Sequence, residues 1–448
     1  MHFSIPETKE VKETNGSSYV VYNIYINGIF HCSMRYSQMH TLNEQLKQVF
    51  GGQALPYFPP KKLFPLSKTQ LEERQFCLEK YLQGVSQQND LVNSSVLRRF
   101  LFSAQQKLAS TWHDDNNLTV WLLNGTQVVV KVTYEDSSEV VLQKVCDQLR
   151  IPHELNQYFS LFVQRQGENG ETSLIHLLQN YECPVITMKQ ISGQTKIVIR
   201  KSYWDASIDI KLLSDRSTLN LLYSQTVFDV ERGWIVTDRD TQEKLATLQS
   251  RGAKRDYLEV SRTLKFYGYV RFEHCTCDYP EPNTETTISI GQKDLIFTPK
   301  SESLADKEFK FRITRIRCWK ITPLNDIKQE VQLSFEYLIN TDKLQWITIV
   351  SEYVFFLSVC LQSIVDELML KKSGTFANNG NSENDNLTTK IPSSSQTTSV
   401  HYQKPSMARR SKINKDISLL TKKIDGKNSS FVPLLENDSF VNIGDDDL

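Results

Sequence analysis

Short segments rich in β-branched and aromatic residues follow one another between residues 266 and 350, and they restrict the possible folds more than any other feature of the chain. Turn residues separate these segments, and one long apolar stretch comes directly after the last of them. Runs of this composition predict strands, and an apolar stretch of that length predicts a helix. We therefore expect seven strands closed by one helix, at Phe266–Phe272, Thr286–Ile290, Leu295–Thr298, Phe309–Ile313, Ile316–Thr322, Val331–Tyr337, Leu344–Val350 and Tyr353–Lys371.

The beginning of the chain predicts a separate small α+β domain. Tyr19–Ile26 and Ile29–Tyr36 are β-rich, and Asn27-Gly28 between them is a strong signal for a type I′ hairpin turn. The proline-rich segment Leu55–Lys62 favours an extended conformation. We expect this N-terminal domain to occupy residues 1–109, with helices near residues 39–49, 71–85 and 96–108.

Two further modules lie between these regions. From Leu118 onward the order is strand, strand, helix, strand, strand, which is typical of a ubiquitin-like fold, and we assign residues 110–204 to this module. Residues 205–265 are mostly helical in pattern. The seven strands and closing helix then form a module at residues 266–372 of the phosphotyrosine-binding or pleckstrin-homology type. A chain of 448 residues has room for two to four domains, so an α+β multidomain protein is expected.

After Lys372 the composition changes to Ser, Asn, Thr, Lys and Gly with few apolar residues. Such a segment cannot bury enough apolar surface to offset its conformational entropy. We therefore expect residues 373–448 to form a disordered tail, which ends in the acidic sequence Ile443, Gly444, Asp445, Asp446, Asp447, Leu448.

The composition excludes some classes of function. Lys plus Arg and Asp plus Glu both number 52, so the chain lacks the basic excess of a nucleic-acid-binding protein. Cys275 and Cys277 have C-x-C spacing without a second pair or a neighbouring His, which favours reduced thiols over a zinc site. No cofactor or metal is expected. The first residues lack the apolar core of a signal peptide, and polar residues interrupt Val354–Leu370, so we expect a cytoplasmic protein that contacts membranes peripherally.

Arg35-Tyr36-Ser37 lies where the second strand enters the first helix, and Lys61 follows Pro59-Pro60. Together these residues resemble the phosphoinositide pocket of the PX domains of sorting nexins, which implies binding of phosphatidylinositol 3-phosphate. The guanidinium of Arg35 can hold a phosphate by two charge-assisted hydrogen bonds, and Ser37 lies at a helix N-terminus, where anions are favoured. The resemblance implies that Tyr36 stacks beneath the inositol ring and that Lys61 reaches the phosphate linking inositol to the lipid.

Arg74 adds an observation that is independent of this resemblance. It falls inside the apolar arc of the helix that contains Leu78, Leu82 and Val85. A charge on a core-facing stripe needs a partner, since an unpaired buried charge is costly. An internal salt bridge or a snorkelling side chain would satisfy it, and so would a ligand; the resemblance implies a contact with inositol hydroxyls.

The whole order of modules resembles the sorting nexins that join a PX domain to an atypical FERM-like body. Runs spread over the chain carry this likeness, among them Met1–Thr8, Phe58–Phe64, Cys275–Pro280, Cys318-Trp319 and Asp366-Glu367-Leu368. The family binds N-P-x-Y or N-x-x-Y signals in cytoplasmic tails of receptors, such as lipoprotein-receptor-like proteins and integrin β. A phosphotyrosine-binding-like fold does this by strand addition between its fifth strand and its closing helix. By position Trp319 and Val365 match the peptide-contacting residues, although both would equally suit the core.

The resemblance has two more implications and leaves alternatives open. The acidic end, Ile443 to Leu448, implies binding to the retriever complex, which recycles cargo to the plasma membrane, and a solvated end without a role is the alternative. The ubiquitin-like module could bind a Ras-type GTPase or be purely structural. An enzyme is not expected, because the chain has no P-loop, kinase, zinc-helix or nucleophile-elbow motif. A FERM-type cytoskeletal scaffold is the remaining alternative, and the PX residues argue against it.

Overall fold

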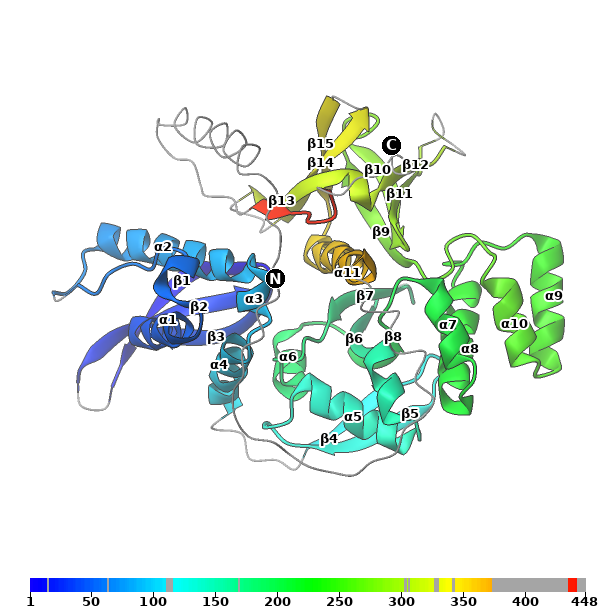
Figure 1. Ribbon diagram of the computed structural model, residues 1–448, viewed down its shortest axis with the longest axis horizontal. Helices are drawn as coiled ribbons and strands as arrows, with labels where there is room; N and C mark the ends of the chain where they lie inside the picture. Colours follow the sequence, from blue (N-terminus) through cyan, green and yellow to red (C-terminus); the bar gives the residue numbers. More distant parts are fainter. Residues whose placement is uncertain are drawn as a thin grey trace, which may run out of the picture. The chain divides into compact units, whose positions relative to one another are not determined.

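The structure is a computed structural model that describes residues 1–440 except 14–15, 63, 110–115, 168–169, 302–303, 305–306, 326–329, 341–342 and 373–433. The expected α+β multidomain architecture is confirmed (Figure 1). The acidic end, residues 443–448, lies outside the described residues, as does most of the predicted tail.

The N-terminal domain is a three-stranded antiparallel sheet, ordered β1-β2-β3, with helices packed on it. Asn27 and Gly28 have φ values of 50° and 79°, so both occupy the left-handed region that the predicted type I′ turn requires. The first strand was not expected from the sequence, and it pairs with β2 along most of its length. The elements are β1 (Phe3–Lys12), β2 (Ser18–Ile26), β3 (Ile29–Arg35), α1 (Tyr36–Phe50), α2 (Lys68–Ser86), α3 (Asn89–Val92), α4 (Ser95–Gln106) and the short 3-10 turns Gly52–Ala54 and Lys107–Ala109.

The ubiquitin-like module is a five-stranded mixed sheet with the order β5-β4-β8-β6-β7, in which β4 and β8 run parallel. Val141, Val145 and Cys146 of α5 are buried in the core beneath this sheet. The elements are β4 (Asn116–Trp121), β5 (Gln127–Val132), α5 (Ser138–Gln148), a 3-10 turn at His153–Tyr158, β6 (Phe159–Gln166), β7 (Thr172–Leu177), α6 (Pro184–Gln190) and β8 (Thr195–Lys201).

The helical module is tied to its neighbours by buried ion pairs. Asp229 of α8 accepts two hydrogen bonds from Arg200 of β8, at 3.0 and 2.9 Å. Asp209 accepts hydrogen bonds from the hydroxyls of Tyr203 and Tyr267, which come from either side of the module along the chain. The elements are a 3-10 turn at Ala206–Ile208, α7 (Asp209–Leu212), α8 (Arg216–Glu231), α9 (Arg239–Ser250) and α10 (Lys254–Ser261).

The third module of the body contains all seven predicted strands and the predicted closing helix. The first strand begins later than expected, because Phe266 has a φ of 66° and belongs to a turn. Cys275 and Cys277 lie on this strand as buried free thiols. The elements are β9 (Val270–Cys277), β10 (Thr284–Gly291), β11 (Asp294–Pro299), β12 (Phe309–Arg312), a 3-10 turn at Ile313–Arg315, β13 (Ile316–Asn325), β14 (Glu330–Asn340), β15 (Lys343–Val350) and α11 (Val354–Lys372).

Helix α11 is apolar around most of its circumference, and the structure shows what covers it. Phe356 contacts Phe272 of β9 on one side, with ring centroids 5.7 Å apart, and Phe162 of β6 on another, at 6.3 Å. Glu367 accepts hydrogen bonds from the backbone of Trp204 and Asp205, both at 2.8 Å. The ubiquitin-like module and its exit segment therefore cover part of the apolar surface of α11.

The predicted tail is ordered in one place. Leu434–Glu436 forms strand β16, drawn in red in Figure 1, which pairs antiparallel with β13 and becomes the last strand of an eight-stranded sheet. The expectation of disorder from residue 373 to 448 is thus corrected for Leu434–Phe440. Composition missed this segment because its stability comes from pairing with a distant strand and not from its own propensity.

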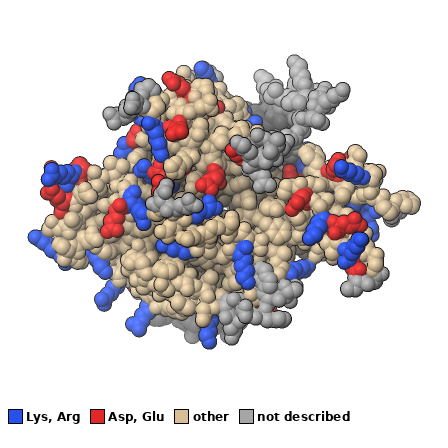
Figure 2. All heavy atoms as spheres, turned by 180° about the vertical axis from the view of Figure 1, so that it is seen from behind, with Lys and Arg blue, Asp and Glu red and all other residues tan. Residues whose placement is uncertain are grey.

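The surface carries mixed charge. On the face shown in Figure 2, Lys and Arg side chains are interspersed with Asp and Glu, as the balanced composition predicts. Within the described part of the chain, no helix is both long and apolar enough to cross a bilayer.

Candidate functional site

Arg35 ends β3 and immediately precedes α1, so its side chain lies beside a helix N-terminus. Its guanidinium stacks on the ring of Tyr19, with Cζ 3.1 Å from the ring centroid. Nη2 is also 2.5 Å from Oε1 of Glu13. Hydrogen bonds with Tyr19 and Glu13 raise the pKa of Arg35, and the side chain is 40% exposed. Arg35 is therefore charged, oriented and accessible, but it is paired with an acid of its own domain.

Tyr36 joins three of the predicted lipid-site segments. Its hydroxyl donates a hydrogen bond of 2.8 Å to the carbonyl of Pro59, which fixes the proline-rich loop against the start of α1. Burial raises the pKa of this hydroxyl, so it remains a neutral donor. The guanidinium of Arg74 lies over the Tyr36 ring, with Cζ 4.5 Å from the centroid. Tyr36 thus brings Arg35, the loop that carries Lys61, and α2 to one place.

Arg74 lies on α2 as the sequence predicts, with its guanidinium over the ring of Tyr36. Among the described residues it forms no salt bridge, and its Nη2 is buried without a hydrogen-bond partner. The side chain interacts instead with Tyr36 and with the hydroxyl of Tyr22. This buried nitrogen is a donor that a polar ligand could satisfy.

Ser37 and Lys61 are both exposed. Ser37 lies in the first turn of α1, where backbone N–H groups point outward and favour an anion. Lys61 lies two residues beyond Pro59, whose carbonyl is held by Tyr36. The sequence did not reveal Glu13, Tyr19 or Tyr22, because these residues reach the site through the pairing of β1, β2 and β3.

The two predicted peptide-site residues are both deeply buried. Trp319 on β13 has no exposed surface, and its indole N–H donates to the hydroxyl of Ser358 on α11 at 2.9 Å. Val365 on α11 is 1% exposed and belongs to the same apolar core. Leu435 of β16 lies directly opposite Trp319 in the strand register and is itself buried.

The outer edge of β13 is the feature that a strand-addition site requires. Among the described residues, the sheet order places β14 on one side of β13 and β16 on the other. Cys318, Trp319 and Lys320 of β13 pair with Glu436, Leu435 and Leu434 of β16. Without β16, this edge would present unpaired backbone donors and acceptors, which is the template that extended peptides bind.

Asn437 follows β16 and has the most extensive contacts of the segment. It is 3% exposed, and its Nδ2 donates to the carbonyls of Ile313 and Ile316 at 2.8 and 2.6 Å. Its backbone N–H donates to the carbonyl of Arg317 at 3.0 Å. Its Oδ1 accepts from the backbone N–H of Ser439, and the N–H of Phe440 donates to its carbonyl. Asn437 to Phe440 thus form a tight turn closed by an Asn side chain.

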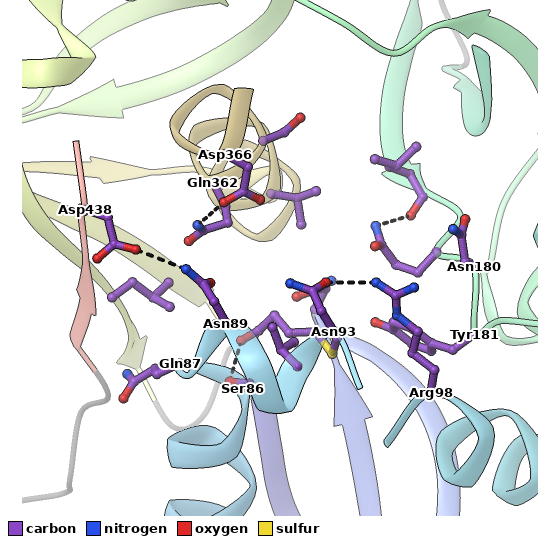
Figure 3. A pocket seen from close by; sticks show the side chains of 18 of the residues that line it. Ser86, Gln87, Asn89, Asn93, Arg98, Asn180, Tyr181, Gln362, Asp366 and Asp438 are labelled. Carbon is purple, nitrogen blue, oxygen red and sulfur yellow. Dashed lines mark hydrogen bonds between the residues drawn. The ribbon is translucent and has the colours of Figure 1, made fainter. Parts of the chain in front are cut away.

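A cavity of about 540 Å³ lies beside β16. Figure 3 shows Asp438, from the turn, hydrogen-bonded to Asn89 of α3 at 3.2 Å, with Gln362 and Asp366 of α11 nearby. The side chain of Gln87 also donates to the carbonyl of Leu434 at 2.6 Å. Side chains of the N-terminal domain therefore contact the tail segment on the side away from β13.

Family models match each of the four modules. The PX domain model matches residues 22–104, and the F1 lobe of the sorting nexin 17/27/31 FERM domain matches residues 116–204. The F2 lobe of the sorting nexin 17/31 FERM domain matches residues 205–265, and the sorting nexin 17 FERM C-terminal domain matches residues 268–369.

Full-length relatives agree with these matches. Sorting nexin-17 of Danio rerio is 41% identical over 389 residues, covering 84% of this chain and 82% of the relative. Sorting nexin-17 of Homo sapiens is 42% identical, covering 84% and 83%. Sorting nexin-31 of Homo sapiens is 31% identical, covering 92% and 96%. The chain therefore belongs to the sorting nexins that combine a PX domain with a FERM body of the sorting nexin 17 and 31 type.

Proposed function

We propose that this sorting nexin is a non-enzymatic endosomal cargo adaptor. It binds phosphatidylinositol 3-phosphate through its PX domain. It binds N-P-x-Y or N-x-x-Y signals of transmembrane receptors through the third module of its FERM body, the third FERM lobe at residues 266–372. It then directs these receptors to recycling through retriever and away from lysosomal degradation. The observation that carries the proposal is the edge of β13, which pairs with an extended segment followed by an Asn-initiated turn.

The proposed lipid pocket consists of Arg35, Tyr36, Ser37, Lys61 and Arg74. In it Arg35 holds the 3-phosphate and Tyr36 stacks under the inositol ring. Two observations support this assignment: Tyr36, at the start of α1, contacts the proline-rich loop and α2, and Arg74 has a buried nitrogen without a partner among the described residues. A phosphate that reaches Arg35 must replace Glu13 or share the guanidinium with it.

Liposome sedimentation of the full chain tests the lipid site. Wild type should sediment with vesicles that contain phosphatidylinositol 3-phosphate and remain in solution with vesicles that contain unphosphorylated phosphatidylinositol. Arg35→Ala should abolish this sedimentation, since it removes the bidentate phosphate contact. Arg239→Ala, which changes an arginine that is 90% exposed on α9, is the matched control. Equal sedimentation of Arg35→Ala and wild type would contradict the assignment.

The proposed cargo groove is the edge of β13 facing α11, with Trp319 and Val365 in its floor. The position of Leu435 opposite Trp319 supports this, because a peptide residue in the same register would pack on the same aromatic ring. Fluorescence titration of the full chain with a labelled receptor-tail peptide tests it. The N-P-x-Y peptide should bind saturably, and the same peptide with Asn changed to Ala should not. Equal binding of the two peptides would refute the groove.

The retriever contact is proposed for Ile443, Gly444, Asp445, Asp446, Asp447 and Leu448, which offer three carboxylates and two apolar side chains. Deletion of Leu448 should abolish retriever pull-down and leave lipid and peptide binding unchanged; a retained interaction would contradict this. Lipid, cargo and retriever contacts on one chain would reinforce each other, since each linked contact raises the effective concentration of the next.

A further inference from the structure

A cluster of buried charges lies between the ubiquitin-like module and the helical module. Arg200 pairs with Asp229 at 2.9 Å, while Lys201 and Arg262 both pair with Asp209, at 3.4 and 3.3 Å. Four of these five side chains are at most 7% exposed, and that of Arg262 is 22% exposed. Three cations therefore share two carboxylates, which leaves one positive charge in excess.

Burial makes this excess costly. It lowers the pKa of Lys201 and raises the pKa of Asp229, since both groups have lost most of their contact with water. A buried charge without a counter-charge is unfavourable, so the cluster has to lose a proton or gain an anion. A proton lost from Lys201 and a bound anion are thus the two ways to balance the cluster.

Arg200 has a hydrogen-bond donor that the cluster does not use. Its Nη2 makes both contacts with the Asp229 carboxylate, at 3.0 and 2.9 Å. Its Nη1 is buried and has no hydrogen-bond partner within the part of the chain that the structure describes, and the residue as a whole is 4% exposed. Buried donors are normally paired, so Nη1 requires an acceptor from outside the described chain.

A cavity of about 40 Å³ lies beside Arg200 and is lined by residues of all three FERM lobes. Among the described residues its lining contains two cationic side chains, Arg200 and Lys201, and no carboxylate. Most of the remaining wall is apolar or aromatic. Ser363 of α11 also lines it, and its hydroxyl accepts a hydrogen bond from the indole of Trp204 at 3.0 Å, so the hydroxyl proton can be donated to another group. Since one water needs about 10–15 Å³ by this measure, the cavity has room for a single small ion.

We propose that this cavity binds one chloride-sized monovalent anion, which accepts hydrogen bonds from Nη1 of Arg200 and from the hydroxyl of Ser363. Such an anion supplies the missing negative charge and contacts residues of all three lobes, so it stabilises their junction. A water molecule would satisfy the same donors but would leave the excess charge in place. The inference is independent of the proposed function, because none of the proposed lipid or cargo residues lines this cavity.

Thermal unfolding of the full chain, followed by tryptophan fluorescence, tests the site. Replacement of gluconate by chloride at constant ionic strength should raise the midpoint saturably, by about 5 °C when chloride is in about hundredfold excess over its Kd. Bromide should act in the same way. Ser363→Leu fills the cavity and removes a donor, so it should abolish the chloride-dependent shift whatever its own midpoint in gluconate. Gln362→Leu changes the preceding residue of α11, which does not line the cavity, and should retain the shift.

A second measurement locates the ion directly. Crystals of the full chain grown in bromide should show an anomalous difference peak next to Nη1 of Arg200, and crystals of Ser363→Leu should not. Ordered density without an anomalous signal, together with equal midpoints in chloride and gluconate, would show that only water fills the cavity and would overturn the inference. A chloride shift of the same size in wild type and Ser363→Leu would place the ion elsewhere and would overturn it as well. Either result would leave the proposed lipid and cargo sites unaffected.

Discussion

Polar groups of the proposed lipid pocket and of the proposed cargo groove both have partners within the protein, but the partners differ in kind. In the PX domain a half-exposed carboxylate, Glu13, pairs with Arg35. In the third FERM lobe a strand and turn from the end of the chain cover β13, and the residues that make the contacts are almost fully buried. A single side chain pairs with Arg35 of the lipid pocket, whereas a backbone segment pairs with the edge of β13.

The difference follows from the free-energy cost of leaving each site without a partner. Water can solvate an exposed guanidinium, so a surface pair such as Arg35 and Glu13 contributes little to stability. An uncovered edge strand leaves a row of unpaired backbone groups beside apolar side chains, and proteins protect such edges. Arg35 is therefore covered by one weak contact, whereas the edge of β13 is covered by several buried contacts together.

Trp319 gives the strongest test of this comparison. Trp319→Ala should destabilise the third FERM lobe by about 3–5 kcal/mol, because it opens a large cavity in the core. It also removes the donor to Ser358. Native-state hydrogen exchange of the β14 amides would measure the loss, and sedimentation with vesicles that contain phosphatidylinositol 3-phosphate should stay unchanged.

Trp346→Ala is the matched control, since Trp346 lies on β15 of the same sheet and is 38% exposed. Trp346→Ala should lower the free energy of unfolding of the lobe far less than Trp319→Ala. Similar protection of the β14 amides in both variants would contradict the burial argument. A peptide-binding defect of Trp319→Ala is informative only after this stability change is known.

A substitution of Arg74 tests the lipid pocket with a smaller expected effect. Arg74→Lys keeps the charge but loses the planar group that stacks on Tyr36 and directs Nη2 into the pocket. We expect about tenfold weaker binding to phosphatidylinositol 3-phosphate vesicles, the size of one charge-assisted hydrogen bond. Arg98→Lys on α4 of the same domain should have no effect. Equal losses in the two variants would indicate a general charge effect instead of a contact with the lipid.

Much of the PX site could be predicted from the sequence because its residues are local or periodic. Arg35, Tyr36 and Ser37 are consecutive, and Arg74 stands out because a charge interrupts an apolar helical stripe. Glu13 and Tyr19 could not be predicted in this way. They reach Arg35 through strand pairing, and no local pattern specifies which surface acid will lie beside a given arginine.

The elements β13 and α11 were also predictable from the sequence, but strand β16, which pairs with β13, was not. The run of β-branched and aromatic residues and the apolar helix identify β13 and α11, whereas composition suggests disorder for the tail that contains Leu435 and Asn437. A local pattern was present, since residues 437–440 read Asn-x-x-aromatic, as do the N-x-x-Y signals proposed as cargo. It gains meaning only when the groove is known, because a spacing of two polar residues between Asn and Phe is common by chance.

Glu13 provides the smallest effect and the sharpest contrast with the groove. Glu13→Gln keeps the shape of the side chain but removes the charge that competes with phosphate for Arg35. Because exposed ion pairs are weak, we expect vesicle binding to strengthen by no more than about fivefold. Glu10→Gln removes the same charge from an exposed position of β1 and controls for general attraction to anionic membranes. If Glu13→Gln weakened binding while Glu10→Gln did not, Glu13 would instead be orienting Arg35 for the lipid. The two sites would then be alike in relying on a partner from within the same chain.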